Sequence, residues 1–269
     1  MDIKNTKIAI LGGGNIGSAI TRGLVRSGNV APGNITLTRR NISKISELTD
    51  LGINISNDNL SAVNNSEIII LAVLPSQLLG LIDSIKGNIE KDRHILVSVV
   101  TAFSLQEITQ KAGVNVPFVR AMPNTASAVC ESMTCLCANP EHQASLEIVK
   151  ELFDQVGSTL IIQENLMSSA TILGACGIAF FMRYIRAASQ GGIQVGFHAA
   201  DAQFIAAQTA RGATSLLLES GNHPEREIDK VTTPLGCTIA GLNEMEHNGL
   251  SSALIKGIVL SYNEITKLK

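Results

Sequence analysis

Four glycines early in the chain have the spacing of a turn that binds phosphate groups. They lie in Gly12-Gly13-Gly14-Asn15-Ile16-Gly17, between a strand-like apolar run (residues 7–11) and a segment with helical periodicity (residues 18–25). In such a unit, Gly12 permits the tight turn, Gly14 lets the backbone approach a pyrophosphate, and Gly17 lets helix and strand pack closely. The helix N-terminus offers free N–H groups to the phosphates. The pattern predicts a dinucleotide-binding turn; the alternative is an ordinary glycine-rich connection.

The residues after the second expected strand, 34–38, indicate which dinucleotide is bound. Folds that bind NAD carry an Asp or Glu there, which holds the ribose 2′-hydroxyl. No acidic residue lies between Ile3 and Ser46, and Arg39 and Arg40 follow the strand instead. An arginine pairs with a 2′-phosphate that a carboxylate would repel. We therefore expect NADPH as the cofactor, with NADH bound more weakly, unless both arginines are only solvated loop charges.

The elements that must position these residues alternate between strand and helix. The apolar runs predict strands at residues 7–11, 34–38, 52–55, 66–73, 94–100, 116–122 and 132–137. Helical patterns lie between them at residues 18–25, 43–50, 75–85, 103–112 and 141–156. This alternation indicates an α/β fold with a doubly wound, Rossmann-type sheet. The ligand crevice is then expected beyond the carboxyl ends of the strands.

The second half of the chain has no convincing strand after residue 164. Long helices are expected at residues 164–190 and 199–219, and a shorter one at 250–268. Their small residues suit close contacts between helices, and we expect this part to pack against a second copy. The sequence therefore predicts an NADP(H)-binding Rossmann domain over residues 1–162 and an all-helical substrate and dimerisation domain over residues 163–269.

Composition excludes several classes of protein. A hydrophobic content of 45% with 16% charged residues is typical of a globular protein with a large core. A formal net charge of −2 argues against a nucleic-acid partner, which needs a basic face. No run of 18 apolar residues without charge is present, so we expect no membrane span. The first residues run directly into the first strand without a signal peptide, and we expect a cytoplasmic protein.

The five cysteines do not form a disulfide framework or a metal site. An odd number of cysteines without regular spacing indicates reduced thiols, as in the cytosol. Cys135 and Cys137, with His142 nearby, lack the C-x-x-C spacing of a zinc knuckle, and their surroundings predict a buried strand. We expect no metal.

Two later stretches complete a resemblance to a known family. Arg120-Ala121-Met122-Pro123-Asn124-Thr125 ends the sixth expected strand, and residues 231–242 include Pro234-Leu235-Gly236-Cys237-Thr238. With the glycine turn and Leu71-Ala72-Val73-Leu74-Pro75, they resemble the Δ1-pyrroline-5-carboxylate reductases over essentially the whole chain. The segment around Thr238 is the most specific part, because the glycine turn alone fits many dehydrogenases.

The resemblance implies an oxidoreductase of proline biosynthesis. Hydride from NADPH would reduce the C=N carbon of Δ1-pyrroline-5-carboxylate and give L-proline. The partners would be this small imino acid and further copies of the chain, as a homodimer or an oligomer of dimers. Cofactor contacts would fall on Leu11, Gly12, Gly13, Gly14, Asn15, Ile16, Arg39, Asn59, Ala72, Val73, Leu74, Pro75, Val100 and Thr101. Substrate contacts would fall on Glu164, Gly236, Cys237 and Thr238, with Thr238 as the catalytic residue.

Local chemistry supports the substrate loop independently. The sequence Pro234-x-Gly236-x-Thr238 leads into a helix, and its backbone N–H groups form a nest for a carboxylate. Thr238 is expected to hydrogen-bond the ring nitrogen; the alternative is that it only caps the helix. A protonated imine is already electrophilic, so the enzyme mainly positions the reactants and excludes water. The absence of an evident acid–base constellation fits this chemistry.

The chain also departs from the family pattern at several positions. Gly174-Ala175-Cys176-Gly177-Ile178-Ala179-Phe180 replaces a run with serines and a proline, and Ile178 is expected to straighten that helix. Leu74 replaces a lysine, Ala102 and Leu235 replace glycines, and His198 replaces a proline. These differences leave two alternatives. One is a related reductase for another cyclic imine or keto acid, and the other is a non-catalytic NADP(H)-binding regulator.

Overall fold

The computed structural model describes residues 2–113 and 115–267, which form two compact units. The first extends to Ile178 and includes the end of the chain from Tyr262; the second is Ala179–Ser261. The division into a cofactor domain, residues 1–162, and a substrate and dimerisation domain, residues 163–269, stays a prediction. The expected last helix, 250–268, extends by one residue beyond the described part.

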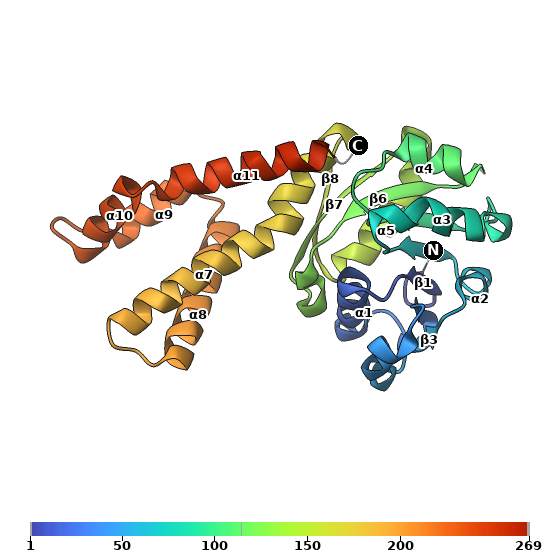
Figure 1. Ribbon diagram of the computed structural model, residues 1–269, viewed down its shortest axis with the longest axis horizontal. Coiled ribbons are helices and arrows are strands. Elements are labelled where there is room, and N and C mark those ends of the chain that lie inside the picture. Colours follow the sequence, from blue (N-terminus) through green and yellow to red (C-terminus); the bar gives the residue numbers. More distant parts are fainter. Residues whose placement is uncertain (1, 114, 268–269) are drawn as a thin grey trace. The chain divides into compact units, whose positions relative to one another are not determined.

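The first unit contains a doubly wound sheet of eight strands (Figure 1). Their spatial order is β3-β2-β1-β4-β5-β6-β7-β8. The strands are β1 (Ile8–Leu11), β2 (Ile35–Thr38), β3 (Asn54–Ser56), β4 (Ile68–Leu71), β5 (Ile95–Ser98), β6 (Phe118–Met122), β7 (Ser132–Ala138) and β8 (Gly157–Ile161). The strands from β1 to β6 pair in parallel, β7 runs antiparallel to β6, and β8 runs parallel to β7. The order reverses between β1 and β4, which is where such sheets bind ligands.

The central strands form because their side chains are aliphatic on both faces. Every residue of β1 and β4 is buried, as expected for parallel strands covered on both sides. Ile8 and Ile10 face one core, while Ala9 and Leu11 face the other. This alternation follows from the two-residue period of a strand.

The helices of this unit cover both faces of the sheet. Side chains of α1 (Asn15–Ser27) and α5 (Gln143–Asp154) belong to the core on one face. Those of α2 (Asn59–Asn64), α3 (Pro75–Ile85) and α4 (Leu105–Ala112) belong to the core on the other. Short 3₁₀ segments connect the elements: η1 (Pro32–Asn34), η2 (Ile42–Leu51), η3 (Lys86–Asn88), η4 (Thr125–Val129), η5 (Pro140–His142) and η6 (Glu164–Leu166).

Most of the predicted elements are confirmed, and three predictions were wrong or incomplete. The expected helix at residues 43–50 is the 3₁₀ segment η2, which begins after the Asn41 side chain accepts a hydrogen bond from the Ser43 N–H. The six-residue helix α2 was not predicted. Strand β8 was also missed, because Leu160 and Ile161 remain exposed and the segment lacks a buried apolar pattern.

The second unit consists of helices only, as predicted (yellow to red in Figure 1). The chain enters it through α6 (Met167–Ala170), the π-helical turn η7 (Thr171–Cys176) and α7 (Gly177–Gln194). The remaining helices are α8 (Ala199–Ser220), α9 (Pro224–Val231), α10 (Cys237–His247) and α11 (Leu250–Thr266).

Large apolar side chains are exposed along these helices. They include Phe181, Met182, Tyr184, Phe204, Leu216, Leu218, Val259 and Leu260, each more than half exposed. A soluble monomer rarely exposes apolar surface on this scale, so these faces indicate an association surface.

The helical stretch Glu164–Gln194 is long and apolar enough, by length and composition, to cross a membrane. Its mean hydropathy is 1.5, and 22% of the apolar window is buried. The sequence has no uncharged run of this length, because α7 contains Arg183 and Arg186, and a membrane span was therefore not expected. A helix that pairs with another copy of a soluble protein has the same composition, so this stretch is weak grounds for a membrane span.

Candidate functional site

The glycine turn has the geometry that its sequence predicts. Gly12 has φ +122°, and a Cβ there would overlap the carbonyl oxygen of Ala72. A Cβ on Gly17 would overlap the carbonyl oxygen of Gly12. At Gly14, by contrast, a Cβ would meet nothing within 4 Å, so this side of the turn is open to a ligand. Gly14 is also the N-cap of α1, and no side chain caps that end of the helix. The first N–H groups of α1 are therefore left for an anion.

Arg39 is fastened to this turn. Its Nη1 atom donates a hydrogen bond of 2.6 Å to the Gly13 carbonyl oxygen, and the side chain is half-buried. The Gly13 N–H in turn donates to the Thr38 carbonyl at 2.7 Å. Arg40 is exposed. The two arginines thus differ, and only Arg39 is fixed beside the position where phosphates are expected.

Asn59 lies across the end of β2 from this turn. Its Oδ1 atom accepts a hydrogen bond of 2.6 Å from Thr38 Oγ1. Asp58 caps the same helix by accepting bonds from the N–H groups of Leu60 and Ser61. The expected contact at Asn59 therefore lies in the first turn of α2, a helix that the sequence did not predict.

The sheet brings the remaining expected cofactor residues to the same edge. Leu11 is in register with Thr38 on one side and Leu71 on the other, and Leu71 is in register with Ser98. The segments that follow these four residues all leave the sheet at its carboxyl edge. They contain the glycine turn, Arg39, Ala72-Val73-Leu74-Pro75, and Val100 with Thr101. Ala72 and Val100 are buried, whereas Leu74 is 65% exposed.

Glu164 is engaged by groups of the first unit. Its Oε1 atom accepts a hydrogen bond of 2.6 Å from the Leu105 N–H and forms an ion pair of 3.0 Å with Arg120 Nη1. The Arg120 side chain is 8% exposed, and its Nε atom has no partner among the described residues. An arginine within the apolar strand Phe118–Met122 was a signal that a buried partner had to exist. The ion pair between Arg120 and Glu164 was nevertheless not predicted.

Glu164 also borders a polar cavity of about 500 Å³. The other lining residues are Gln106, Thr109, Gln110, Asn139 and Glu141. Behind this region, burial raises the pKa of the Cys137 thiol to about 11, although the nearby Arg120 charge lowers it. Cys137 is therefore a neutral thiol within the core and not a nucleophile.

The loop before α10 has its own constraints in the second unit. Leu235 adopts the left-handed conformation, with φ 58°, and its side chain is fully exposed. The Gly236 N–H donates to the Thr233 carbonyl at 2.9 Å, and a Cβ on Gly236 would lie 2.6 Å from Thr233 Oγ1. Gly236 is the N-cap of α10, which begins at Cys237. The alternative that Thr238 caps this helix is wrong, because Thr238 lies inside the first turn.

The helix around Ile178 is not straightened. A π-helical turn occupies Thr171–Cys176 directly before it, so the expectation from the missing proline was wrong. The Asn124 Nδ2 atom donates a hydrogen bond of 3.1 Å to the Gly174 carbonyl in this turn. A tertiary contact therefore supports the irregular helix, and such turns are frequent at functional sites.

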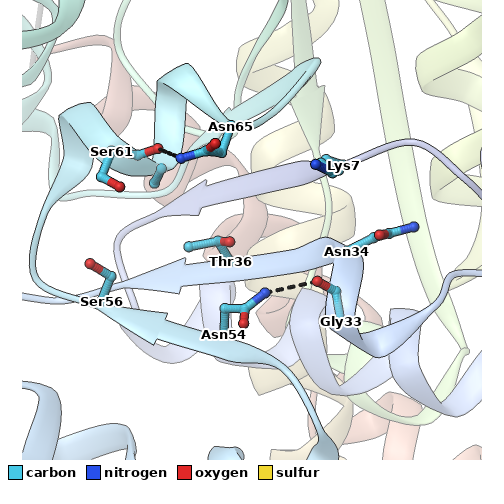
Figure 2. Close-up of a pocket in the computed structure, with 9 residues that line it drawn as sticks. Lys7, Gly33, Asn34, Thr36, Asn54, Ser56, Ser61 and Asn65 are labelled. Carbon is cyan, nitrogen blue, oxygen red and sulfur yellow. Dashed lines mark hydrogen bonds between the residues drawn. The ribbon is translucent and has the colours of Figure 1, made fainter.

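A second polar cavity, of about 320 Å³, lies apart from the expected site residues (Figure 2). It is bordered by strands β1 to β3 and helix α2, and none of the predicted contacts lines it. Its residues are Lys7, Gly33, Asn34, Thr36, Asn54, Ser56, Ser61, Ala62 and Asn65. Its three asparagine amides already donate within the protein, Asn34 to the Lys4 carbonyl, Asn54 to the Gly33 carbonyl and Asn65 to the Ser61 carbonyl.

Two sequence families match the two parts of the chain. The family described as NADP oxidoreductase coenzyme F420-dependent matches residues 7–102, which contain the glycine turn and Arg39. The family described as pyrroline-5-carboxylate reductase dimerisation matches residues 164–268. The second match covers the helices whose apolar faces are exposed.

Full-length relatives and a solved structure agree with these matches. Pyrroline-5-carboxylate reductase 2 of Dictyostelium discoideum is 49% identical over 283 residues, which cover 99% of this chain and 94% of the relative. Reductase 1 of that organism is also 49% identical, but this chain spans only 51% of its length. The structure of Plasmodium falciparum pyrroline carboxylate reductase with NADP bound shares the fold, with a TM-score of 0.88, 21% identity and 98% of each chain covered. The chain belongs to the pyrroline-5-carboxylate reductase family.

Proposed function

We propose that the chain reduces Δ1-pyrroline-5-carboxylate to L-proline with NADPH. The observation that carries this proposal is the 49% identity, along almost the whole length of both chains, to pyrroline-5-carboxylate reductase 2 of Dictyostelium discoideum. The geometry of the glycine turn and of Arg39 supports the choice of NADPH. A related reductase and a non-catalytic regulator remain the competing functions.

The cofactor would be held along the carboxyl edge of the sheet. Backbone N–H groups from Gly14 to Ile16, at the start of α1, would bind the pyrophosphate, because a Cβ is absent at the open Gly14. The N–H groups of Gly12 and Gly13 are used on the Thr38 carbonyl and hold the shape of the turn. Arg39 would pair with the 2′-phosphate. We assign the nicotinamide half to the segments after β4 and β5, which contain Ala72–Pro75 and Val100–Thr101. NADPH supplies the hydride when it is bound there.

The substrate would be held by the loop before α10. The first N–H groups of α10, those of Cys237 and Thr238, would bind the carboxylate, and Gly236 would let it approach without a Cβ in the way. The Thr238 hydroxyl would bond the ring nitrogen. We also propose a substrate-side role for Glu164, whose Oε1 atom is held by Arg120 and the Leu105 N–H. These groups orient the imine and exclude water, which is most of what this reduction requires of the protein.

We further propose that the chain acts as a homodimer or a larger homo-oligomer in the cytoplasm. The exposed apolar helices and the match to a dimerisation family support association through residues 164–268. In this proposal the helical stretch Glu164–Gln194 lies in protein and not in lipid, and the formal charge of −2 gives no basic face for nucleic acid.

A steady-state assay of NADPH oxidation tests the activity. We expect oxidation that depends on Δ1-pyrroline-5-carboxylate and is slower with NADH. Reactions without substrate, and with a six-membered cyclic imine or a keto acid, serve as comparisons. Faster turnover of one of those compounds would favour the related reductase. NADPH binding without turnover of any of them would favour the regulator.

A further inference from the structure

The motif Arg120–Thr125 is part of the family resemblance, but none of its residues is among the proposed contacts with cofactor or substrate. Arg120 is 7% exposed and Asn124 is 6% exposed. They stand four positions apart, where strand β6 ends and the 3₁₀ segment η4 begins. Buried polar side chains of this kind need partners, and each of these two reaches into the segment formed by residues 164–176.

Asn124 is fixed through three of its atoms. Its N–H donates to Ser132 Oγ at 3.1 Å, and its Oδ1 atom accepts a bond of 2.9 Å from the Ala126 N–H. These two bonds direct the remaining amide donor, Nδ2, at the Gly174 carbonyl, 3.1 Å away. The side chain is therefore oriented before it contacts the helical segment.

The partner of Asn124 lies inside the π-helical turn. Moving from the i→i+4 to the i→i+5 register leaves one carbonyl without its usual helical donor. A donor from outside the helix satisfies such a carbonyl and stabilises the irregular turn. Asn124 supplies a donor of this kind to the Gly174 carbonyl, within Thr171–Cys176.

Arg120 holds the same segment at its beginning. Its Nη1 atom pairs with Glu164 Oε1 at 3.0 Å, and Glu164 is the first residue of η6. The Leu105 N–H, at the start of α4, donates to the same carboxylate oxygen. Residues 164–176 are thus attached to the end of β6 at two points, one at each end of the segment.

We propose that Arg120 and Asn124 are positioning residues for the reaction. They fix the course of residues 164–176, and the chain continues from there through α7 into the helical unit that carries the Thr238 loop. Asn124 maintains the π-helical turn, and its effect on turnover passes through that turn. The kinetic part of this inference rests on the proposed reductase activity; the structural part does not.

The variant Asn124→Asp separates the two functions of the side chain. Aspartate keeps the oxygen that accepts from the Ala126 N–H but loses the donor to Gly174. The matched control is Asn65→Asp, which removes an exposed amide bond to the Ser61 carbonyl and touches no proposed contact. Both proteins are full-length and are compared with the wild type.

We expect kcat for Asn124→Asp to fall by at least about three- to tenfold. The loss of one neutral hydrogen bond sets this lower limit, and the aspartate oxygen that replaces the amide nitrogen adds repulsion from the Gly174 carbonyl. The dissociation constant of NADPH, measured by fluorescence, should change less than about twofold, because the glycine turn is untouched. Hydrogen exchange should speed up in peptides covering residues 171–178 and stay unchanged in α5. The Asn65→Asp control should match the wild type in all three measurements.

Two results would overturn the inference. One is unchanged exchange at residues 171–178 in Asn124→Asp. The other is faster exchange that extends equally into α5, with loss of NADPH binding, since that describes general destabilisation. If the wild type does not reduce the imine, the proposed function fails, and hydrogen exchange alone still decides whether Asn124 holds the turn.

Discussion

Arg39 connects the backbone of the phosphate turn with the expected position of the 2′-phosphate. Its bond to the Gly13 carbonyl holds the guanidinium in place without using its positive charge on an acidic partner. An anchored arginine loses less side-chain entropy when it binds a ligand than a free one does. This distinguishes Arg39 from the exposed Arg40 beside it.

Replacing Arg39 with Glu should raise the Michaelis constant for NADPH about 10- to 100-fold, as expected for loss of a charged hydrogen-bond pair. The constant for NADH should rise much less, because NADH has no 2′-phosphate. Steady-state kinetics with both cofactors measure this, and Arg40→Glu is the control with the same charge change. Equal effects of Arg39→Glu on NADPH and NADH would contradict the assignment.

Thr238 is the residue on which the proposed imine chemistry depends most directly. Thr238→Ala should lower kcat/KM by about 3- to 100-fold, since each 1.36 kcal/mol of lost transition-state binding is a factor of ten. NADPH affinity should not change. The free energy of unfolding should change by less than about 0.5 kcal/mol, because Thr238 is not the helix cap.

Thr232→Ala is the matched control for Thr238→Ala. Thr232 Oγ1 donates to the Asp229 carbonyl at 3.2 Å, near the end of α9, and has no proposed role with substrate. The Thr232→Ala variant should therefore retain the wild-type kcat/KM. A Thr238→Ala enzyme with full activity, or one that loses NADPH and substrate together, would remove this loop from the substrate site.

At the scale of elements, two of the departures from the family pattern put a side chain where the backbone favours glycine. Ala102, after β5, has φ 75°, and Leu235, before α10, has φ 58°. These are the positions where the family pattern has glycine. The left-handed conformation costs a residue with a Cβ about 1–2 kcal/mol. Both turns therefore hold a backbone conformation that favours glycine in spite of the side chain.

Ala102→Gly should leave the free energy of unfolding unchanged or raise it by about 1 kcal/mol. The substitution removes the strain of the left-handed conformation, about 1–2 kcal/mol. That gain equals or exceeds the stability lost because glycine has more conformational entropy in the unfolded chain, about 0.4–1 kcal/mol. Denaturant titration without cofactor measures the change. Ala144→Gly, at an exposed position of α5, is the control and should lose about 0.5–1 kcal/mol. Equal losses in the two variants would show that Ala102 is unstrained.

The elements that the sequence predicts well are those whose pattern depends on local burial. β4 is a continuous apolar run, and the helix after Pro75 begins and ends where it was predicted. β8 escaped because it is an edge strand with exposed Leu160 and Ile161. The antiparallel direction of β7 also left no local signal, because it depends on pairing with β6.

The candidate site could likewise be predicted only where its residues follow local patterns. The cofactor residues follow strand ends, and a strand end is visible in the sequence. The contacts of Glu164 with Arg120 and of Asn124 with Gly174 join residues 44 and 50 positions apart. No local periodicity encodes such pairs, so only the folded structure reveals them.

For the whole molecule, the main physical demand is to cover the exposed apolar helices. Side chains such as Phe204, 72% exposed, and Leu218, 81% exposed, would be unfavourable in water. We therefore predict that the wild type is a dimer or an oligomer of dimers at micromolar concentration, with a mass of at least about 57 kDa, twice 28.5 kDa. Light scattering coupled to size-exclusion chromatography measures this.

Phe204→Glu should weaken that association, because it places a charge on the apolar face. Gln203→Glu, at the neighbouring exposed position, adds the same charge and should leave the dimer intact. A stable wild-type monomer at micromolar concentration would contradict the prediction.

The position of the sheet in the chain also determines the order in which the protein can be made. The eight strands of the described residues lie within positions 8–161, so at least 108 further residues, 162–269, are made after the last strand. At roughly 5–20 residues per second, the synthesis of those residues takes on the order of 5 to 20 s. The sheet of the first unit thus has time to fold on the nascent chain before most of the apolar helical surface leaves the ribosome. Because the apolar helices are made last, their exposed surface spends less time without a partner copy.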